Sequence, residues 1–160
     1  MTVTSSLFDE GGTINISAAH PSVGGDNVSP DLAWSDPPAG TESFAVTCWD
    51  PDAPTTVGFC HLVLANLPPD ARSLRAGAGA AERCPPGAVL GFTDFGESQY
   101  GGMAPPAGDP PHHYQFTVFA LDVAEVDANE VTTYAKLRFL IRDHILASGT
   151  LTGRFGVSSG

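Results

Sequence analysis

Two aspartates stand one residue apart in the segment Asp50-Pro51-Asp52-Ala53-Pro54. A residue that precedes proline is restricted to extended backbone geometry, and proline fixes its own φ at a similar value. In such a rigid segment the two aspartate side chains are expected to project to the same side. Neighbouring carboxylates raise each other's pKa, so the pair is expected at a site that handles charge or protons. The alternative is a surface turn, where Asp and Pro are common.

Histidines and glycines further along the chain favour a site over a turn. His61 lies in the middle of an apolar stretch, where a buried polar group must find a partner. His112 opens a second apolar stretch, after a segment rich in glycine and proline. In that segment Gly101-Gly102 offers backbone amides without side chains, which can approach an anion closely. We therefore expect a pocket for a small anion around the two aspartates and these two histidines, although core histidines and a plain glycine turn remain alternatives.

The elements that position these side chains are predicted to be strands. Alternation over Ser43 to Asp50 predicts a strand with one face formed by Phe44, Val46, Cys48 and Asp50. Phe59 to Asn66 predicts a second strand, buried on both sides, in which His61 shares a face with Val63 and Ala65 and the other face carries Cys60, Leu62 and Leu64. A third strand is predicted over Tyr114 to Asp122.

One helix is predicted near the C-terminus, over Tyr134 to Ser148. Its apolar stripe repeats at helical spacing and consists of Leu137, Leu140, Ile141, His144 and Ile145. Thr132 or Thr133 is expected to cap its start, and Gly149 to follow its end. Elsewhere glycine (18) and proline (14) separate short apolar runs, as in a chain of strands joined by turns. The expected fold class is mostly β, a Greek-key β-sandwich with one substantial C-terminal helix.

Composition narrows the class of protein. A chain of 160 residues suits one domain over 1–160. The formal charge of -11 disfavours binding to nucleic acid or to an anionic membrane surface. The N-terminus has no signal-peptide pattern, and no apolar stretch is long enough to cross a bilayer. Three cysteines without a CxxC spacing are typical of buried free thiols in a reducing compartment. A soluble cytoplasmic protein is expected.

Two ordered blocks of sequence resemble the phosphatidylethanolamine-binding protein family, in its bacterial Raf kinase inhibitor-like branch. The first block joins the aspartate segment at 50–54 to Gly58-Phe59-Cys60-His61 and Asn66-Leu67-Pro68. The second runs from Tyr100-Gly101-Gly102 through Pro105-Pro106-Ala107-Gly108 and His112-His113-Tyr114 to Phe119-Ala120-Leu121-Asp122. The resemblance extends from about Ser29 to Gly153.

The resemblance implies a β-sandwich with a small anion-binding pocket at one end. By motif position the pocket is lined by Asp50, Asp52, His61, His112 and Tyr114, with the backbone of Gly101 and Gly102 nearby. The same branch implies a homodimer. Two positions depart from the pattern: Met103-Ala104 replaces a usual Pro-Cys, and Leu62 replaces a usual aromatic residue after His61. Both are expected to reshape the wall of the pocket.

The charges of this pocket set a condition on binding. Two ionised aspartates repel a phosphate or carboxylate, so either a histidine or one of the carboxyl groups must be protonated. The aspartates are expected to raise the pKa of His61 and His112, which makes both rings donors near neutral pH. The Tyr114 hydroxyl and the loop amides are expected to complete the hydrogen bonds. Affinity for the anion should therefore fall as pH rises.

Three other functions compete with simple ligand binding. The first is a cofactor-independent enzyme that uses Asp52, His61 and His112 for acid/base chemistry, as a cyclase, epimerase or hydrolase. No GxSxG motif or other activated nucleophile supports it. The second is a zinc site formed by the two histidines and an aspartate, although their spacing matches no compact zinc motif. The third is a regulatory role through a protein partner such as a kinase, which the family name suggests and no residue specifies.

Overall fold

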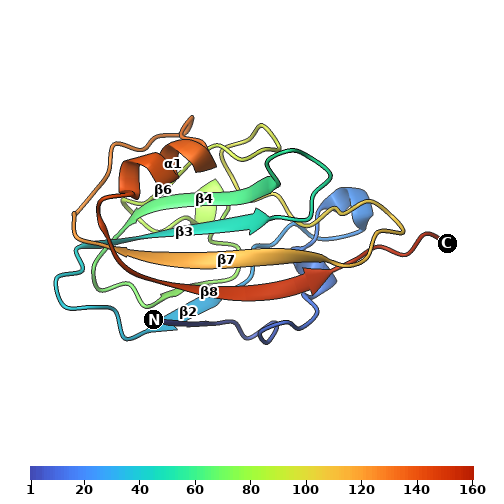
Figure 1. Cartoon of the computed structure of the whole chain (residues 1–160), viewed down its shortest axis with the longest axis horizontal. Helices are drawn as coiled ribbons and strands as arrows, with labels where there is room; N and C mark the ends of the chain where they lie inside the picture. The colour runs from blue at the N-terminus through green and yellow to red at the C-terminus, as the bar shows by residue number, and fades with distance from the viewer.

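The computed structural model describes all residues, 1–160, and contains two β-sheets and one α-helix. The larger sheet has the strand order β6 (Val89–Leu90), β4 (Phe59–Leu67), β3 (Ser43–Asp50), β7 (His112–Leu121) and β8 (Ile145–Phe155). The smaller sheet has the order β1 (Thr2–Thr4), β2 (Leu32–Ser35) and β5 (Ser73–Leu74). Helix α1 (Tyr134–Ile141) lies beside β4, and β2 lies on the opposite side of the large sheet (Figure 1). The expected mostly-β class with one α-helix is confirmed.

Strands β3 and β4 are covered on both faces, by the smaller sheet and by α1, which explains their nearly continuous apolar sequences. Along β3, Phe44 and Val46 pack into the core between the two sheets, and Ala45 packs into a second core beneath α1. The second core includes Leu137 and Ile141, the two buried residues of the helix. All strand pairs are antiparallel. The alternation predicted for β3 is therefore confirmed.

The strand directions bring three chain segments together at one end of the large sheet. Strand β3 ends at Asp50, while its neighbours β4 and β7 begin at Phe59 and His112. Because both neighbours run antiparallel to β3, its C-terminal end lies beside their N-terminal ends. In Figure 1 this is the end of the sheet nearest the C-terminus of the chain.

The helix is shorter than its sequence pattern predicts. It begins at Tyr134 as predicted, with the Thr133 side chain accepting a hydrogen bond from the Lys136 amide, but it ends at Ile141. From Ile145 the chain pairs with β7 along the whole of β8, and this long antiparallel ladder outweighs the local helical preference. Gly149 is therefore part of a strand, where a side chain would collide with the backbone of Met1.

A β-bulge changes the faces predicted for β4. Cys48 pairs with Leu62, whereas the next residue, Trp49, pairs with Cys60, so His61 is an extra residue in the ladder. The extra residue shifts the alternation by one position. Cys60 consequently faces the helix together with Val63 and Ala65, and His61 leaves the face predicted for it. Its ring instead meets Tyr114, which belongs to the core between the sheets.

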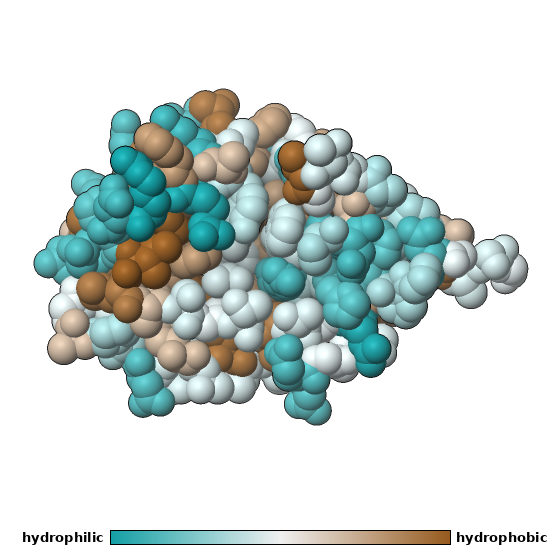
Figure 2. Space-filling model, in the orientation of Figure 1, coloured by the Kyte–Doolittle hydropathy of each residue, from teal (hydrophilic) through white to brown (hydrophobic).

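The outer surface differs between the two ends of the molecule. Strands β7 and β8 present hydroxyl side chains to solvent, including Thr117 and Thr150, whose hydroxyls lie 2.9 Å apart. Figure 2 shows a mostly pale or hydrophilic surface on this face, with a hydrophobic area at the end that carries α1. Phe139 of α1 and Leu146 of β8 are two of the exposed large apolar side chains.

Candidate functional site

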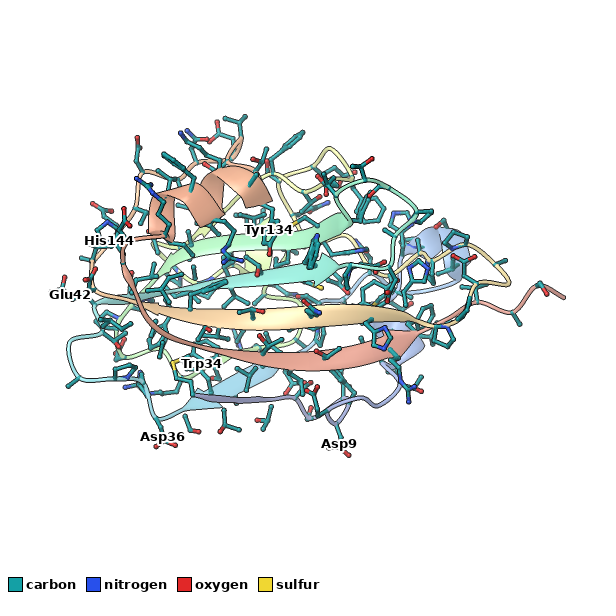
Figure 3. All side chains as sticks on the ribbon, in the orientation of Figure 1. Asp9, Trp34, Asp36, Glu42, Tyr134 and His144 are labelled. Atoms are coloured by element: carbon teal, nitrogen blue, oxygen red, sulfur yellow. The ribbon has the colours of Figure 1, made fainter.

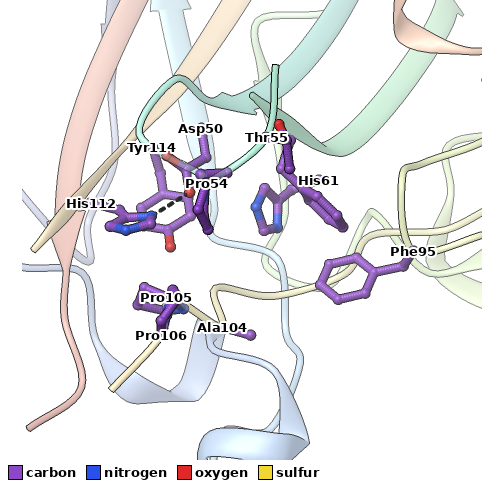
Figure 4. Close-up of a pocket in the computed structure, with 12 residues that line it drawn as sticks. Asp50, Pro54, Thr55, His61, Phe95, Ala104, Pro105, Pro106, His112 and Tyr114 are labelled. Atoms are coloured by element: carbon purple, nitrogen blue, oxygen red, sulfur yellow. Dashed lines mark hydrogen bonds and ion pairs between the residues drawn. The ribbon is translucent and has the colours of Figure 1, made fainter. Parts of the chain in front are cut away.

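A pocket of about 290 Å³ opens at the end of the large sheet where β3, β4 and β7 meet. Its polar groups come from these strands, and its apolar walls come from the loops around residues 53–55, 95 and 104–106 (Figure 4). The lining residues are Asp50, Ala53, Pro54, Thr55, Phe59, His61, Phe95, Ala104, Pro105, Pro106, His112 and Tyr114. Four residues expected at the site, Asp50, His61, His112 and Tyr114, therefore line one hollow.

His112 is held between two carboxylates. Its Nδ1 lies 2.8 Å from Asp50 Oδ2, and its Nε2 lies 3.0 Å from Asp109 Oδ2. Ionised carboxylates accept hydrogen bonds, so both contacts are satisfied when both ring nitrogens carry protons, which is the imidazolium form. Burial opposes this charge, but the hydrogen bonds to Asp50 and Asp109 outweigh it and raise the pKa of His112. The direction of this shift agrees with the raised pKa predicted for His112.

Asp50 is buried and bound from two sides. Its Oδ2 accepts the proton on His112, and its Oδ1 accepts the backbone amide of Asp52 at 2.8 Å. Its side chain is 4% exposed, against 5% for His112, so the pair is sheltered from water and from salt. The negative charge nearest the pocket is therefore neutralised within the protein.

His61 differs from the expectation, because its pKa is lowered and the neutral form of the ring is favoured. Its Nδ1 lies 2.7 Å from the backbone oxygen of Gly101, and a carbonyl can only accept, so Nδ1 carries the proton. Burial of the ring lowers the pKa of His61, although Gly101 and Asp50 act in the opposite direction. Its Nε2, which has no partner within the chain, is therefore a hydrogen-bond acceptor. The predicted raised pKa is wrong for this residue, because desolvation exceeds the attraction of Asp50.

Tyr114 brings an unused donor to the pocket. The residue is 1% exposed, and its hydroxyl oxygen is buried without a hydrogen-bond partner. Burial raises the pKa of Tyr114, and Asp50 acts in the same direction, so the hydroxyl keeps its proton. Its ring packs edge-on against that of His61, with the centroids 5.2 Å apart. In Figure 4 the Tyr114 ring lies between the two histidine rings. Buried hydroxyls usually have partners, so the Tyr114 hydroxyl is a candidate donor to a ligand in the pocket.

Asp52 does not line the pocket. Its Oδ2 accepts hydrogen bonds from the backbone amide and ring Nδ1 of His113, both at 2.7 Å. Burial is the largest single effect on Asp52 and opposes its ionisation, but the two hydrogen bonds from His113 together outweigh it and lower the pKa of Asp52. His112 and His113 point to opposite faces of β7, so their aspartate partners also separate. The expectation that Asp50 and Asp52 share a side fails for this reason.

Gly101 and Gly102 do not offer free amides to the pocket. The Gly101 amide donates to the backbone oxygen of His61 at 3.0 Å, and the Gly102 amide donates to Asn27 Oδ1 at 2.7 Å. Both glycines are required by close packing instead. A Cβ on Gly101 would lie 2.2 Å from the Phe95 ring, and a Cβ on Gly102 would lie 2.4 Å from backbone atoms of residues 18 and 19. The pair therefore holds the His61 ring and one wall in place.

Three residues near the site were missed by reasoning from sequence. Asp109 binds His112, Phe95 forms a wall, and Asn27 fixes the loop of the two glycines through the amide of Gly102 and the backbone oxygen of Tyr100. Asp109 stands three residues before His112, a spacing that was visible but not specific. Asn27 and Phe95 carry no such signal, because their contacts depend on distant parts of the chain.

The two departures from the family pattern have unequal effects. Leu62 and Met103 are buried in the core between the sheets, away from the lining of the pocket. Ala104 does line the pocket. The expected change in the wall is therefore confined to Ala104.

A model of one protein family matches residues 4–156 of the chain, and its description is phosphatidylethanolamine-binding protein. The chain belongs to this family. The Escherichia coli relative UPF0098 protein YbhB is 50% identical over 132 residues, which cover 82% of this chain and 83% of YbhB. The crystal structure of E. coli YbcL matches with a TM-score of 0.94 and 37% identity, over 98% of both chains. A homologue from Chlamydia trachomatis, CT736, matches with a TM-score of 0.82 and 31% identity, over 96% of this chain and 95% of that one.

Two further findings bear on the expected classes of function. No helix of this family member is both long enough and apolar enough to cross a membrane. The chain also contains no group of three or more histidine, cysteine, aspartate or glutamate side chains placed to hold a metal ion.

Proposed function

We propose that the pocket binds a small anionic ligand that carries a phosphate or a similar oxyanion. The observation that carries this proposal is the buried Tyr114 hydroxyl without a partner, which lies in a pocket beside a charged His112 and a neutral His61. A hydroxyl donor in such a place is stabilised by a ligand oxygen. The positive charge of His112 cancels one of the two carboxylate charges that contact it, which lessens the repulsion of an anion in a chain with a net charge of -11.

The donors and acceptors of the pocket favour a phosphate over a carboxylate. Tyr114 offers a proton, whereas His61 Nε2 offers a lone pair. A ligand that satisfies both must present an acceptor oxygen and a donor hydroxyl on the same small group. The singly protonated form of phosphate or of a phosphomonoester does this, and an ionised carboxylate does not. We therefore assign the protonated phosphate as the preferred species.

The size and walls of the pocket limit what else the ligand contains. A volume of about 290 Å³ is at the lower end for small-molecule sites, which indicates a ligand of few atoms. Pro54, Pro105 and Phe95 provide apolar contacts around the polar floor. A phosphomonoester with a short organic group fits both features. The family name supports a phosphate-bearing ligand, because phosphatidylethanolamine contains one.

Calorimetry with methyl phosphate between pH 5 and 9 tests the proposal. We expect binding to weaken as pH rises through the second pKa of the ligand, which is about 6, and again as His112 loses its proton. Tyr114→Phe should weaken binding at pH 6 by about 10-fold or more, since a hydrogen bond to a charged group contributes roughly 1.5–3 kcal/mol. Dimethyl phosphate, which has no hydroxyl, is the matched ligand control and should bind more weakly.

Affinity that is flat or rises with pH would contradict the assignment of the protonated species. Binding that Tyr114→Phe leaves unchanged would contradict the pocket itself. Thermal unfolding of the variant serves as a control for folding. The hydroxyl makes no hydrogen bond within the protein, so its removal should leave the unfolding temperature within a few degrees of wild type.

A further inference from the structure

His112 has no free N–H group to offer to a ligand in the free protein. Asp50 accepts the hydrogen bond from Nδ1, and Asp109 accepts the one from Nε2. The Asp50 contact is almost completely buried, so it cannot be exchanged without exposing the interior of the site. Nε2 is therefore the ring nitrogen that a ligand can use, and a carboxylate of the protein occupies it.

The two carboxylates differ sharply in how firmly they are held. The Asp109 side chain is 39% exposed, and its carboxylate has no hydrogen-bond partner other than His112. It sits in a turn of the loop before β7, in which its amide donates to the backbone oxygen of Pro106 at 3.2 Å. Ion pairs open to water contribute little stability, so this side chain can leave His112 at small cost.

We propose that Asp109 is a tethered competitor of the ligand, holding His112 Nε2 in the free protein and releasing it to an oxyanion that enters the pocket. This inference rests on the proposed function, because it concerns the same pocket and the same class of ligand. The carboxylate of Asp109 has the same chemistry as that ligand, an oxygen acceptor with negative charge. A ligand must therefore bind His112 Nε2 more strongly than Asp109 does, which disfavours molecules with weak hydrogen-bond acceptors.

The surroundings of Asp109 offer a second position for its side chain. Asp109 lines a separate hollow of about 490 Å³, together with Arg154 and Phe155. The Arg154 side chain donates through Nε to the backbone oxygen of Gly11, which places a guanidinium at this hollow. A displaced carboxylate thus moves toward space and positive charge rather than into the core.

Calorimetry with inorganic phosphate at pH 6 tests the inference with two variants of the same residue. Asp109→Ala removes the competitor and should tighten binding by about 2- to 5-fold, the upper part of the range expected for loss of a partly exposed ion pair. Asp109→Asn should tighten it less, because the amide oxygen still accepts a hydrogen bond from Nε2. Tyr114→Phe is measured in parallel and reports on the pocket itself.

The matched control is Asp122→Asn. Asp122 also forms a partly exposed pair with a histidine, His144, at 2.9 Å, so the variant removes the same charge and the same kind of contact. Asp122 follows β7 directly at the end remote from His112, and Figure 3 shows His144 at the α1 end of the molecule. Phosphate affinity of this variant should stay within about twofold of wild type, because an exposed charge at that distance is largely screened.

The outcomes separate the two proposals. Tighter binding in both Asp109 variants, with no change in Asp122→Asn, supports the tethered competitor. Phosphate binding that depends on Tyr114 but is unchanged or weaker in Asp109→Ala overturns the competitor and leaves the proposed function standing. Equal tightening in Asp122→Asn also overturns it, since net charge then explains the effect. No binding by wild type or any variant overturns the proposed function and the competitor together.

Discussion

Replacement of Asp50 by asparagine isolates the contribution of the buried pair with His112. The two side chains are 4% and 5% exposed, and their closest atoms are 2.8 Å apart. Loss of one partner of a buried ion pair typically costs about 3–5 kcal/mol, because the remaining charge is left without compensation. The amide oxygen of the Asp50→Asn side chain can still accept a hydrogen bond from Nδ1, so the lower end applies and we expect a loss of about 3 kcal/mol. For a chain of 160 residues this corresponds to a fall of roughly 6–12 °C in Tm.

The pH dependence of this loss provides the sharper test. The pKa of His112 is raised in the folded protein, so its stabilisation is complete below the ordinary histidine pKa and is lost as pH rises through the folded value. The difference in the free energy of unfolding between wild type and Asp50→Asn should therefore be largest near pH 6 and smaller at pH 9. Urea unfolding at a series of pH values, followed by the fluorescence of buried Trp34, measures it.

A double-mutant cycle with His112→Asn assigns the effect to the pair. The coupling free energy should be at least about 1 kcal/mol, as for other side chains in direct contact. Asp122→Asn, which breaks an exposed pair with His144, should cost less than about 1 kcal/mol. A loss at Asp50 no greater than that at Asp122, or one that does not vary with pH, would refute the reasoning.

Three further variants test other parts of the structure. Gly101→Ala places a methyl group 2.2 Å from the Phe95 ring, so it should lower stability by about 1–3 kcal/mol and weaken phosphate binding, measured by thermal unfolding and calorimetry. His61→Asn removes a ring whose pKa is lowered by burial. As pH falls from 7 to 5, the free energy of unfolding of wild type should therefore decrease relative to that of the variant. This trend is opposite to that expected for His112, and urea unfolding measures it. Thr133→Ala deletes the cap that binds the Lys136 amide and should cost about 1 kcal/mol by the same assay.

Strands β3, β4 and β7 were predictable because their signal is local. The alternation from Ser43 to Asp50 assigns each side chain to a face without reference to the rest of the chain, and both faces agree with the structure. The start of α1 was equally local, because the Thr133 side chain caps the Lys136 amide only three residues away. The end of α1 was not predictable from local sequence, because the pairing of Ile145 with Leu121 joins segments that are distant in sequence.

The candidate site also has features that the sequence predicts and features that only the tertiary structure shows. The resemblance of its two sequence blocks located Asp50, His61, His112 and Tyr114, which line one pocket. The direction of each side chain and its protonation depend on the tertiary structure. A bulge turns His61 toward Tyr114, and burial keeps its ring neutral.

The sequence by itself determined the family, the strands β3, β4 and β7 and the residue types that meet at the end of the sheet. Only the tertiary structure decided which aspartate faces each histidine: Asp50 and Asp109 bind His112, whereas Asp52 binds His113 on the opposite face of β7. The physical reason is that electrostatics and desolvation depend on distances and burial in space. A separation of two residues along the chain fixes neither, and a single extra residue in a ladder reverses the face of a side chain.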